Sequence, residues 1–504
     1  MATAHPERNR PVNRPHLRPL ERMVVERHAS WLELFFDLVF ILAMSQISRI
    51  LSSESDWVGF SKYLLLFVPV WWTWIGYTFY ADRFETTETI FRMLVFVGML
   101  GIVGFSISIS SVFSPAGDTS FIVGLAVARI ALVALYARAA YYVPLARSYC
   151  LLFAMALSVS AALMFTSLLL EPQMRYVVWA ILFLSELLIP FLNLRVTRLT
   201  PIDGSHIPER FGLFTIIVLG EAVILTATSV SSVRWNIATI LTAVLGFAMA
   251  GCIWWINFDF VEDNAIRSSS LKKRFVYLYG HFLIVASIVT TGVGVEHAIR
   301  QTGEAHLHLP TLTLMAGGLA AYLATVTTIR LIMGVCNLAY ARISTIVLAL
   351  AFIFIGNFLP PFAIVAALFL VLAIGIWIET RYTPLRSPET SDQDRSDHVR
   401  PCDHAAEAVV YKARSGDGCE ECVKNNYKWV HLRICLSCGH VGCCDSSVNR
   451  HATKHFLKTG HPIMASLETG EHWSWCYVDE RFVPLAKPVK YRSENGEAAS
   501  VKVD

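Results

Sequence analysis

Charged residues are scarce in this chain. Asp, Glu, Lys and Arg make up 16% of its 504 residues, whereas soluble globular proteins contain about 25%. Hydrophobic residues make up 55%, which excludes a protein that is mainly soluble. The formal net charge is only +3, and no basic run alternates with aromatic residues. Nucleic acid is therefore not an expected partner.

Three common enzyme signatures are also missing. The sequence contains no P-loop, no G-x-S-x-G and no H-E-x-x-H motif. These motifs mark nucleotide hydrolysis, serine hydrolases and zinc proteases. We therefore expect no enzyme activity and no catalytic residues.

Long apolar runs fill the chain from about Trp31 to about Glu379. Each has roughly 20 residues, enough to cross about 30 Å of hydrocarbon as an α-helix. The sequence thus predicts an all-α membrane domain over residues 28–380, within a lipid bilayer. The twelve predicted spans begin near Trp31, Phe60, Thr89, Phe121, Ser148, Arg175, Phe211, Trp235, Phe275, Pro310, Ala341 and Pro360.

The first 27 residues form a basic tail that contains six arginines. Positive charge is retained on the cytoplasmic side of a membrane, and this tail is too polar for a signal peptide. The loops expected on the same side are also basic, and Arg210, Arg330 and Arg342 are assigned to them. An even number of spans returns the chain to that side. We expect an inner (plasma) membrane protein with both termini in the cytoplasm.

The two halves of the membrane domain resemble each other. The segment IVLGEAVILTA (Ile217–Ala227) matches LFFDLVFILAM about 184 residues earlier and sets Glu221 against Asp37. At nearly the same offset, WWINFDFVEDN (Trp254–Asn264) matches WWTWIGYTFYADR (Trp71–Arg83). This pattern is typical of two tandem six-helix repeats inserted in the same orientation, as in many transporters.

Glu33 and Asp37 lie inside the first predicted span. Residues four apart share a helix face, and an acid at bilayer depth is normally found against a partner or a wet cavity. One interpretation is that such acids hold helices together, or that Glu33 simply lies at the interface. The other is a proton or cation path, for which the candidates are Glu33, Asp37, Glu221, His281, Glu296 and His297.

Four motifs occur in order from about His28 to Glu379. They are WLELFFDLVF, HIPERFGLF followed by LGE, YGH and GVEH. Together they resemble the bacterial low-temperature-requirement A (LtrA) membrane family. The resemblance implies a multi-pass membrane protein and names no substrate.

The composition changes after the last span. Residues 381–400 are polar and lack apolar periodicity, which is typical of a flexible linker. A second domain is predicted over 401–487, followed by a C-terminal tail over 488–504. Eight of the eleven cysteines lie between Cys402 and Cys476. In a reducing compartment this clustering indicates zinc rather than disulfides.

The run WVHLRICLSCGHVGCC, with RHATKH, TGHP and WSWCY, resembles the UBP-type zinc finger. That family is a small α+β domain that binds the free C-terminal tail of ubiquitin in eukaryotes. The resemblance implies two to three zinc ions. One would be held by Cys419, Cys422, Cys443 and His451, a second by Cys435, Cys438, His455 and His461, and a third by Cys402, His404 and Cys476, with Asp479 where the family has a further cysteine.

One position departs from the ubiquitin-binding members. They read G-C-G-R where this chain reads G-C-C-D, so Asp445 replaces the arginine that holds the ubiquitin carboxylate. An anion repels a chain-end carboxylate, and ubiquitin is therefore not an expected partner. Trp429, Trp475 and Tyr477 could still line a pocket for another peptide or protein.

These features predict a proton- or cation-linked transporter or channel with a cytoplasmic zinc-binding module that recognises a peptide or protein. The alternative is a membrane scaffold or stress-response protein that recruits a partner through its zinc finger, without transport.

Overall fold

The chain divides into two compact units, Met1–Pro384 and Leu385–Asp504, in the computed structural model. The boundary lies within the segment predicted as a linker, and each unit is described by itself. The described residues of the first unit are 15, 28–84, 88–114, 117–192, 206–260, 271–333 and 339–382. Those of the second are 490–492, 498–500 and 402–483 without 403, 406–407, 411, 415–417, 445–446, 448, 469–472 and 479–480.

Twelve helices in the described residues are long and apolar enough to cross a membrane, as predicted. Each begins within a few residues of its predicted start. The first half contains α1 (Trp31–Ser53), α2 (Trp57–Arg83), α3 (Thr89–Ser108), α4 (Gly117–Tyr142), α5 (Arg147–Ser167) and α6 (Pro172–Leu192). The second contains α8 (His206–Ser231), α9 (Ile237–Phe260), α11 (Leu271–Arg300), α13 (Gly318–Met333), α14 (Ala339–Ile355) and α15 (Pro361–Tyr382).

The tenth span is built from three pieces. A short helix α12 (Leu309–Leu312) and a π-helical turn (Thr313–Gly317) lead directly into α13. Within this span, Gly318 lies against α11, where an added Cβ would be 2.9 Å from the backbone nitrogen of Thr291. The irregular turn therefore lies next to a close approach of two helices.

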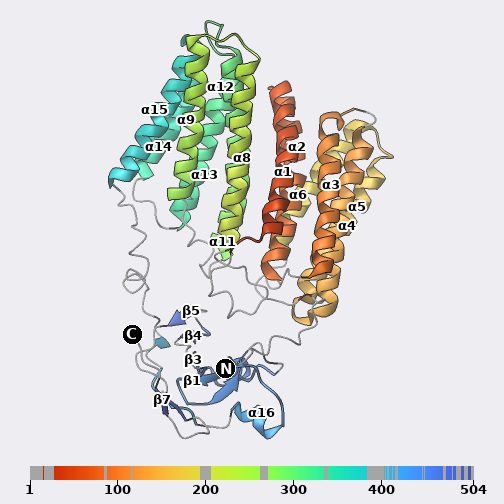
Figure 1. Ribbon diagram of the computed structural model, residues 1–504, viewed down its shortest axis with the longest axis vertical. Coiled ribbons are helices and arrows are strands. Elements are labelled where there is room, and N and C mark those ends of the chain that lie inside the picture. Colours follow the sequence, from red (N-terminus) through yellow and green to blue (C-terminus); the bar gives the residue numbers. More distant parts are fainter. Residues whose placement is uncertain are drawn as a thin grey trace, which may run out of the picture. The chain divides into compact units, whose positions relative to one another are not determined.

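The two halves use the same pattern of helix neighbours, and Figure 1 shows their helices as two groups. In the first half α1 contacts α2 and α3, and a chain of contacts runs through α3, α4, α5 and α6 and closes on α2. In the second half α8, α9, α11, α13, α14 and α15 repeat these contacts in the same order, and α15 closes on α9. The helices α1 and α8 join the halves by direct contact.

Small residues allow α3 and α4 to pack closely. A Cβ added at Gly101 would lie 2.4 Å from the nitrogen of Ala128, and one added at Gly124 would lie 2.3 Å from the nitrogen of Phe105. Helices in lipid associate through this kind of packing because lipid tails are as apolar as the side chains. A larger residue at either glycine would push the helices apart.

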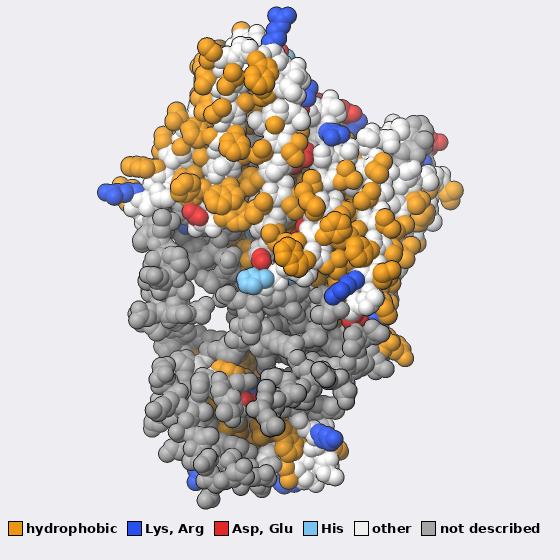
Figure 2. Space-filling view, in the orientation of Figure 1, with side chains coloured by type: hydrophobic (Ala, Val, Ile, Leu, Met, Phe, Trp, Pro, Cys, Tyr) orange, Lys and Arg blue, Asp and Glu red, His pale blue; other side chains and the backbone are white. Residues whose placement is uncertain are grey.

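The outer surface of the membrane unit is apolar. Large hydrophobic side chains such as Leu100, Ile130 and Phe354 are more than half exposed. Figure 2 shows hydrophobic side chains over the visible face of the helices. Such a surface suits contact with lipid rather than with water.

The second unit is the small α+β domain that the sequence predicts. Its antiparallel sheet has the order β2-β1-β3-β4-β5, and its core includes Ile434, Leu436 and Ile463. The predicted tail contains a hairpin of β6 (Lys490–Arg492) and β7 (Ala498–Ser500). The strands of the sheet are β1 (Leu432–Cys435), β2 (Val441–Cys443), β3 (Ile463–Ser466), β4 (Ser474–Cys476) and β5 (Arg481–Val483). The α-helices described in this unit are α16 (Glu420–Lys424) and α17 (His451–Thr459).

Candidate functional site

Buried charges meet where the first turns of α1 and α8 pack near the end of α2. This charge cluster consists of Glu33, Asp37, Asp82, His206 and Arg210, none of which is more than 4% exposed. Its members come from three helices and from both halves of the membrane unit. The polar side chains are thus directed at one another rather than at lipid.

Asp37 is held by one cation and one indole. Nη2 of Arg210 donates to Oδ1 of Asp37 at 2.6 Å, and Nε1 of Trp74 donates to the same oxygen at 2.8 Å. Arg210 belongs to the second half and Trp74 to α2. A buried carboxylate is tolerated when it has such partners, so this pair favours the interpretation that Asp37 holds helices together.

Glu33 takes part in both a helix cap and an interhelical contact with His206. Its Oε2 accepts from the backbone nitrogen of Ser30 at 2.7 Å, and Oγ of Ser30 accepts from the nitrogen of Glu33. This is a capping box at the start of α1. Its Oε1 lies 3.2 Å from Nε2 of His206, whose Nδ1 lies 3.0 Å from Oδ1 of Asp82. The imidazole of His206 therefore bridges carboxylates on α1 and α2.

Sequence reasoning placed three buried arginines in loops, among them the partner of Asp37. Arg210, Arg330 and Arg342 were assigned to cytoplasmic loops, but they lie within α8, α13 and α14 and are buried. Charges near the end of an apolar run look like loop residues in a sequence. The available signal was spacing, because His206 and Arg210 are four residues apart and share a helix face, as do Glu33 and Asp37.

A second group of polar residues lies between α1, α8 and α11. Oγ of Ser48 donates to Oε1 of Glu221 at 3.0 Å, and Oγ of Ser52 donates to Oε1 of Glu296 at 2.9 Å. Arg300 also donates to Oε1 of Glu296, at 2.7 Å. Among the described residues, Oε2 of Glu221 and Oε2 of Glu296 are buried without a hydrogen-bond partner. These four side chains from α1, α8 and α11 (Ser48, Ser52, Glu221, Glu296) are the second acid cluster.

The two predicted path histidines lie in different surroundings. Nε2 of His297 is 2.9 Å from the backbone oxygen of Ser52, next to the second acid cluster. His281 packs among aromatic rings, with ring centroids 4.2 Å from Tyr277 and 4.8 Å from Phe211. Only His297 is therefore placed beside one of the predicted path acids by these contacts.

The alignment that sets Glu221 against Asp37 predicts equal depths for the two acids in tandem repeats, and the structure shows that they lie at different depths. Asp37 pairs with Arg210 and Ser48 with Glu221, and both pairs are separated by 173 positions. The helices α1 and α8 are therefore parallel, and 11 residues (221 minus 210) separate the two levels, or about 16 Å along the axis. The reason is that α8 starts at His206, 15 residues before its acid, whereas α1 starts at Trp31, six residues before Asp37.

An aromatic layer separates the charge cluster from the second acid cluster. It contains Phe40 of α1, Trp71 and Trp74 of α2 and Phe214 of α8, all buried. The ring centroid of Phe214 is 4.4 Å from that of Trp74, 5.5 Å from Trp71 and 6.4 Å from Phe40. The interface of α1 and α8 is thus polar at two levels and apolar between them.

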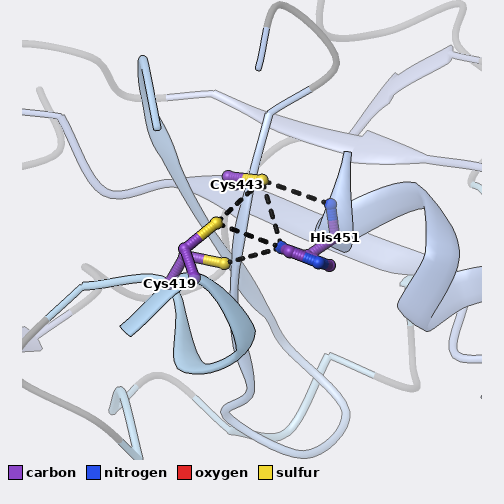
Figure 3. A group of neighbouring side chains, drawn as sticks. Cys419, Cys443 and His451 are labelled. Atoms are coloured by element: carbon purple, nitrogen blue, oxygen red, sulfur yellow. Dashed lines mark hydrogen bonds between the residues drawn. The ribbon is translucent and has the colours of Figure 1, made fainter. Parts of the chain in front are cut away.

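The second unit brings together the first predicted zinc-ligand set, Cys419, Cys422, Cys443 and His451. Nδ1 of His451 lies 3.1 Å from Sγ of Cys419 and 3.4 Å from Sγ of Cys443 (Figure 3). The sulfurs of Cys422 and Cys443 are 3.9 Å apart. A tetrahedral zinc site has ligand-to-ligand distances of about 3.3–3.8 Å, given Zn–S near 2.3 Å and Zn–N near 2.0 Å. The donor set therefore fits zinc.

The second predicted set, Cys435, Cys438, His455 and His461, is also assembled. Sγ of Cys438 is 3.4 Å from Nε2 of His455, and Sγ of Cys435 is 3.6 Å from Nδ1 of His461. Burial lowers the pKa of His455 to about 4, with help from His440 and His461. Its imidazole is then neutral, which is the form that binds zinc.

The third set is only partly described. Cys402, His404 and Cys476 offer ligand atoms within 4.8 Å of one another, while Asp479 lies outside the described residues. Asp445 also lies outside them, so its predicted role in the pocket is not described.

The three predicted pocket aromatics lie near the two four-ligand zinc sites or in the sheet. Trp429 lies beside the first zinc site and against Gly418, where an added Cβ would be 2.4 Å from Cζ2 of the indole. Tyr477 stacks on Phe456 beside the second zinc site. Trp475 lies in β4 opposite Met464. Trp429 and Tyr477 therefore lie beside different zinc sites.

The ion pair of the charge cluster generates a stability prediction. Arg210→Met should lower the free energy of unfolding by about 3–5 kcal/mol, because it leaves the Asp37 carboxylate buried without its cation. Combining Arg210→Met with Asp37→Asn should recover part of this loss. Thermal unfolding of the protein in detergent micelles measures both variants. Additive losses in the double variant would show that the two side chains do not interact.

Two family models match the chain. The model for the bacterial low temperature requirement A protein (LtrA) matches residues 28–377. The model for the Zn-finger in ubiquitin-hydrolases and other proteins matches residues 419–487.

Individual relatives match either most of the chain or less than a fifth of it. An uncharacterized protein of Rhizobium meliloti is 26% identical over 389 residues, which is 71% of this chain and 94% of that protein. The NAD-dependent deacetylase sir2A of Dictyostelium discoideum is 40% identical over 65 residues, 13% of this chain and 11% of the deacetylase. A solution NMR structure of a protein from Rhodopseudomonas palustris is 45% identical and covers 18% of this chain and 97% of its own, with a TM-score of 0.16.

The four LtrA-like motifs, the twelve membrane helices and the match over residues 28–377 agree with one another. The match covers well over half of the chain. The protein therefore belongs to the bacterial low temperature requirement A family and is a multi-pass membrane protein that also carries a zinc-binding UBP-type finger.

Proposed function

We propose that the membrane unit moves a proton or another cation along the interface of α1, α8 and α11. The observation that carries this proposal is the placement of two buried acid groups on one face of α1. Glu33 and Asp37 lie near its start, and Ser48 and Ser52 hold the second acid cluster near its end. Buried acids that face the interior of a helix bundle are typical of ion and proton paths.

The acids have different roles in this proposal. Asp37 is neutralised by Arg210 and acts mainly in packing. Glu221 forms no ion pair among the described residues, and Arg49 acts on it only at longer range. Glu296 pairs with Arg300, whose side chain is half exposed, whereas the cation of Asp37 is buried. Like Asp37, both acids keep one buried carboxylate oxygen without a hydrogen-bond partner among the described residues. Glu221 and Glu296 are therefore the residues that bind the cation or proton.

The aromatic layer is the closed part of this path. Hydrophobic constrictions stop ions because water leaves them. Phe40 and Phe214 belong to the two helices that carry the acids, so a movement of α8 relative to α1 changes the constriction. This arrangement supports a gated path rather than an open pore.

A flux measurement tests the transport proposal. Full-length protein in liposomes should dissipate a gradient of H⁺, Na⁺ or K⁺ faster than empty liposomes do. Glu221→Gln and Glu296→Gln keep the size of the side chain and remove its charge, so each should lower the flux by at least about tenfold. Ion-sensitive dyes inside the liposomes report the rates.

Glu304→Gln is the matched control, because Glu304 is exposed and pairs only with His308 among its described contacts. It should leave the flux unchanged. Wild-type flux equal to that of empty liposomes for all three ions would contradict transport. Unchanged flux in Glu221→Gln and Glu296→Gln would contradict the assignment of the path.

We also propose an inner membrane location with both termini in the cytoplasm. The six arginines of the N-terminal tail and the even number of spans support this orientation. A reducing compartment also suits the zinc-ligand thiols.

Reporter fusions test this orientation. Alkaline phosphatase fused before Trp31 or after Arg381 should be inactive, because it needs the oxidising side of the membrane, whereas green fluorescent protein at the same positions should fluoresce. A fusion between α1 and α2 should give the opposite result. Active phosphatase after Arg381 would place the zinc finger outside the cell and contradict the orientation.

The zinc finger is proposed to hold two ions at its complete four-ligand sites and a third at Cys402, His404 and Cys476. The full ligand sets leave no open position for water, which supports a structural or recognition role rather than catalysis. The match to a protein-recognition finger favours a peptide or protein ligand. Recruitment of that ligand without transport is the second candidate function.

Two neighbouring cysteines provide a zinc test. Cys443 belongs to the first ligand set, while Cys444 is buried beside Ser447, with 3.5 Å between Sγ and Oγ. Cys443→Ser should lower the zinc content of the purified chain by at least one ion, and Cys444→Ser should leave it unchanged. Elemental analysis counts the ions. Equal zinc contents in the two variants would exclude Cys443 as a ligand.

A further inference from the structure

Two side chains lie between the first and second zinc sites and belong to neither. Nε2 of His440 is 2.8 Å from Oε1 of Glu421. His440 follows β1 and is only 6% exposed, while Glu421 lies in α16 between Cys419 and Cys422. The pair therefore connects the loop of the first site with the hairpin that carries Cys435.

Each member of the pair also contacts a zinc ligand. Sγ of Cys419 lies 3.6 Å from Oε2 of Glu421. A zinc-bound Cys419 is a thiolate with no proton to donate, so the first turn of α16 then joins Glu421 to the first site. The ring of His440 stacks on that of His455, with centroids 4.1 Å apart and planes inclined by 6°. A continuous series of contacts thus runs from Cys419 of the first site to His455 of the second.

The backbone links the sites as well. His451 and His455 lie one turn apart on α17 but belong to different ligand sets. Cys435 and Cys443 lie on the paired strands β1 and β2 and again belong to different sets. The ligands of the two sites therefore alternate in pairs along the chain, and the two sites share α17 and the β1–β2 hairpin.

The contacts of Glu421 and His440 act on ligand orientation. A histidine that binds zinc needs its ring held at a fixed angle, and partners outside the ligand set commonly do this. The stack with His440 fixes the ring plane of His455, and Glu421 fixes His440. Because Glu421 follows Cys419 by two residues, ordering of the first site by zinc also orders this pair.

We propose that Glu421 and His440 are positioning residues that couple the two sites, so that both take up and release zinc together. The inference rests on the proposed loading of both sites. Coupling between two binding sites typically changes affinity by about 5- to 150-fold. Loss of the pair should therefore separate the two affinities while leaving all eight ligands in place.

The test counts ions during stepwise removal of zinc. The full-length protein with Cys402→Ser, which removes a ligand of the third set, is titrated with a chelator and examined by native mass spectrometry. The parent should pass from two ions to none, with little of the form that holds one. His440→Ala and Glu421→Ala should each populate the one-ion form, with release midpoints at least about fivefold apart.

Two variants separate coupling from packing. In Glu421→Gln the amide oxygen still accepts from His440, so joint release should be kept. His431→Ala removes another histidine, which is 39% exposed and lies near Glu468, and should also keep joint release. If His440 served only to hold His455, its loss would weaken the second site and leave the release midpoint of the first site at the parent value, whereas loss of coupling shifts both midpoints.

The outcomes distinguish this inference from the loading on which it rests. Joint release by both His440→Ala and Glu421→Ala would overturn the coupling role and assign any cooperativity to the shared backbone. Release in two separate steps by the parent would also overturn it. Fewer than two ions in the parent before chelation would instead contradict the proposed loading of the sites.

Discussion

The ion pair between Asp37 and Arg210 joins two six-helix halves where the hydrophobic effect cannot. Helices in lipid gain little from burying apolar surface, so close packing and paired polar groups decide how they associate. Each half also has an internal pair of the same kind, Arg129 with Glu186 in the first and Arg342 with Glu379 in the second. Because a lone charge in this setting is costly, each pair restricts its helices to a few arrangements.

The register of α1 and α8 follows from this constraint. Once Arg210 is opposite Asp37, the parallel direction of the helices places Glu221 opposite Ser48. Phe40 and Phe214 then meet between the two polar levels. The apolar constriction and the second acid cluster are therefore consequences of one contact near the start of both helices.

The sequence contained enough to predict the spans and the zinc-ligand sets, but not the charge cluster. Span length and apolar composition are local properties, and the cysteine and histidine spacing matched a family pattern in which the three ligand sets recur together. The partner of Asp37 depends on how segments 173 residues apart pack. No local pattern carries that information. For the same reason, aligning the two halves in sequence did not give the depth of Glu221, because a sequence repeat does not specify where each helix starts.

The spacing of Glu33 and Asp37 has a consequence for movement. Arg210 lies 2.6 Å from Asp37 through Nη2 and 3.8 Å from Glu33 through Nη1. The two acids are one helical turn apart, or about 6 Å along α1. A one-turn slide of α8 would bring Arg210 to Glu33, but it would leave Asp37 buried without its cation and opposite Phe214. The two acids therefore give the helix pair one preferred register, because only the observed position keeps the guanidinium beside Asp37 and within reach of Glu33.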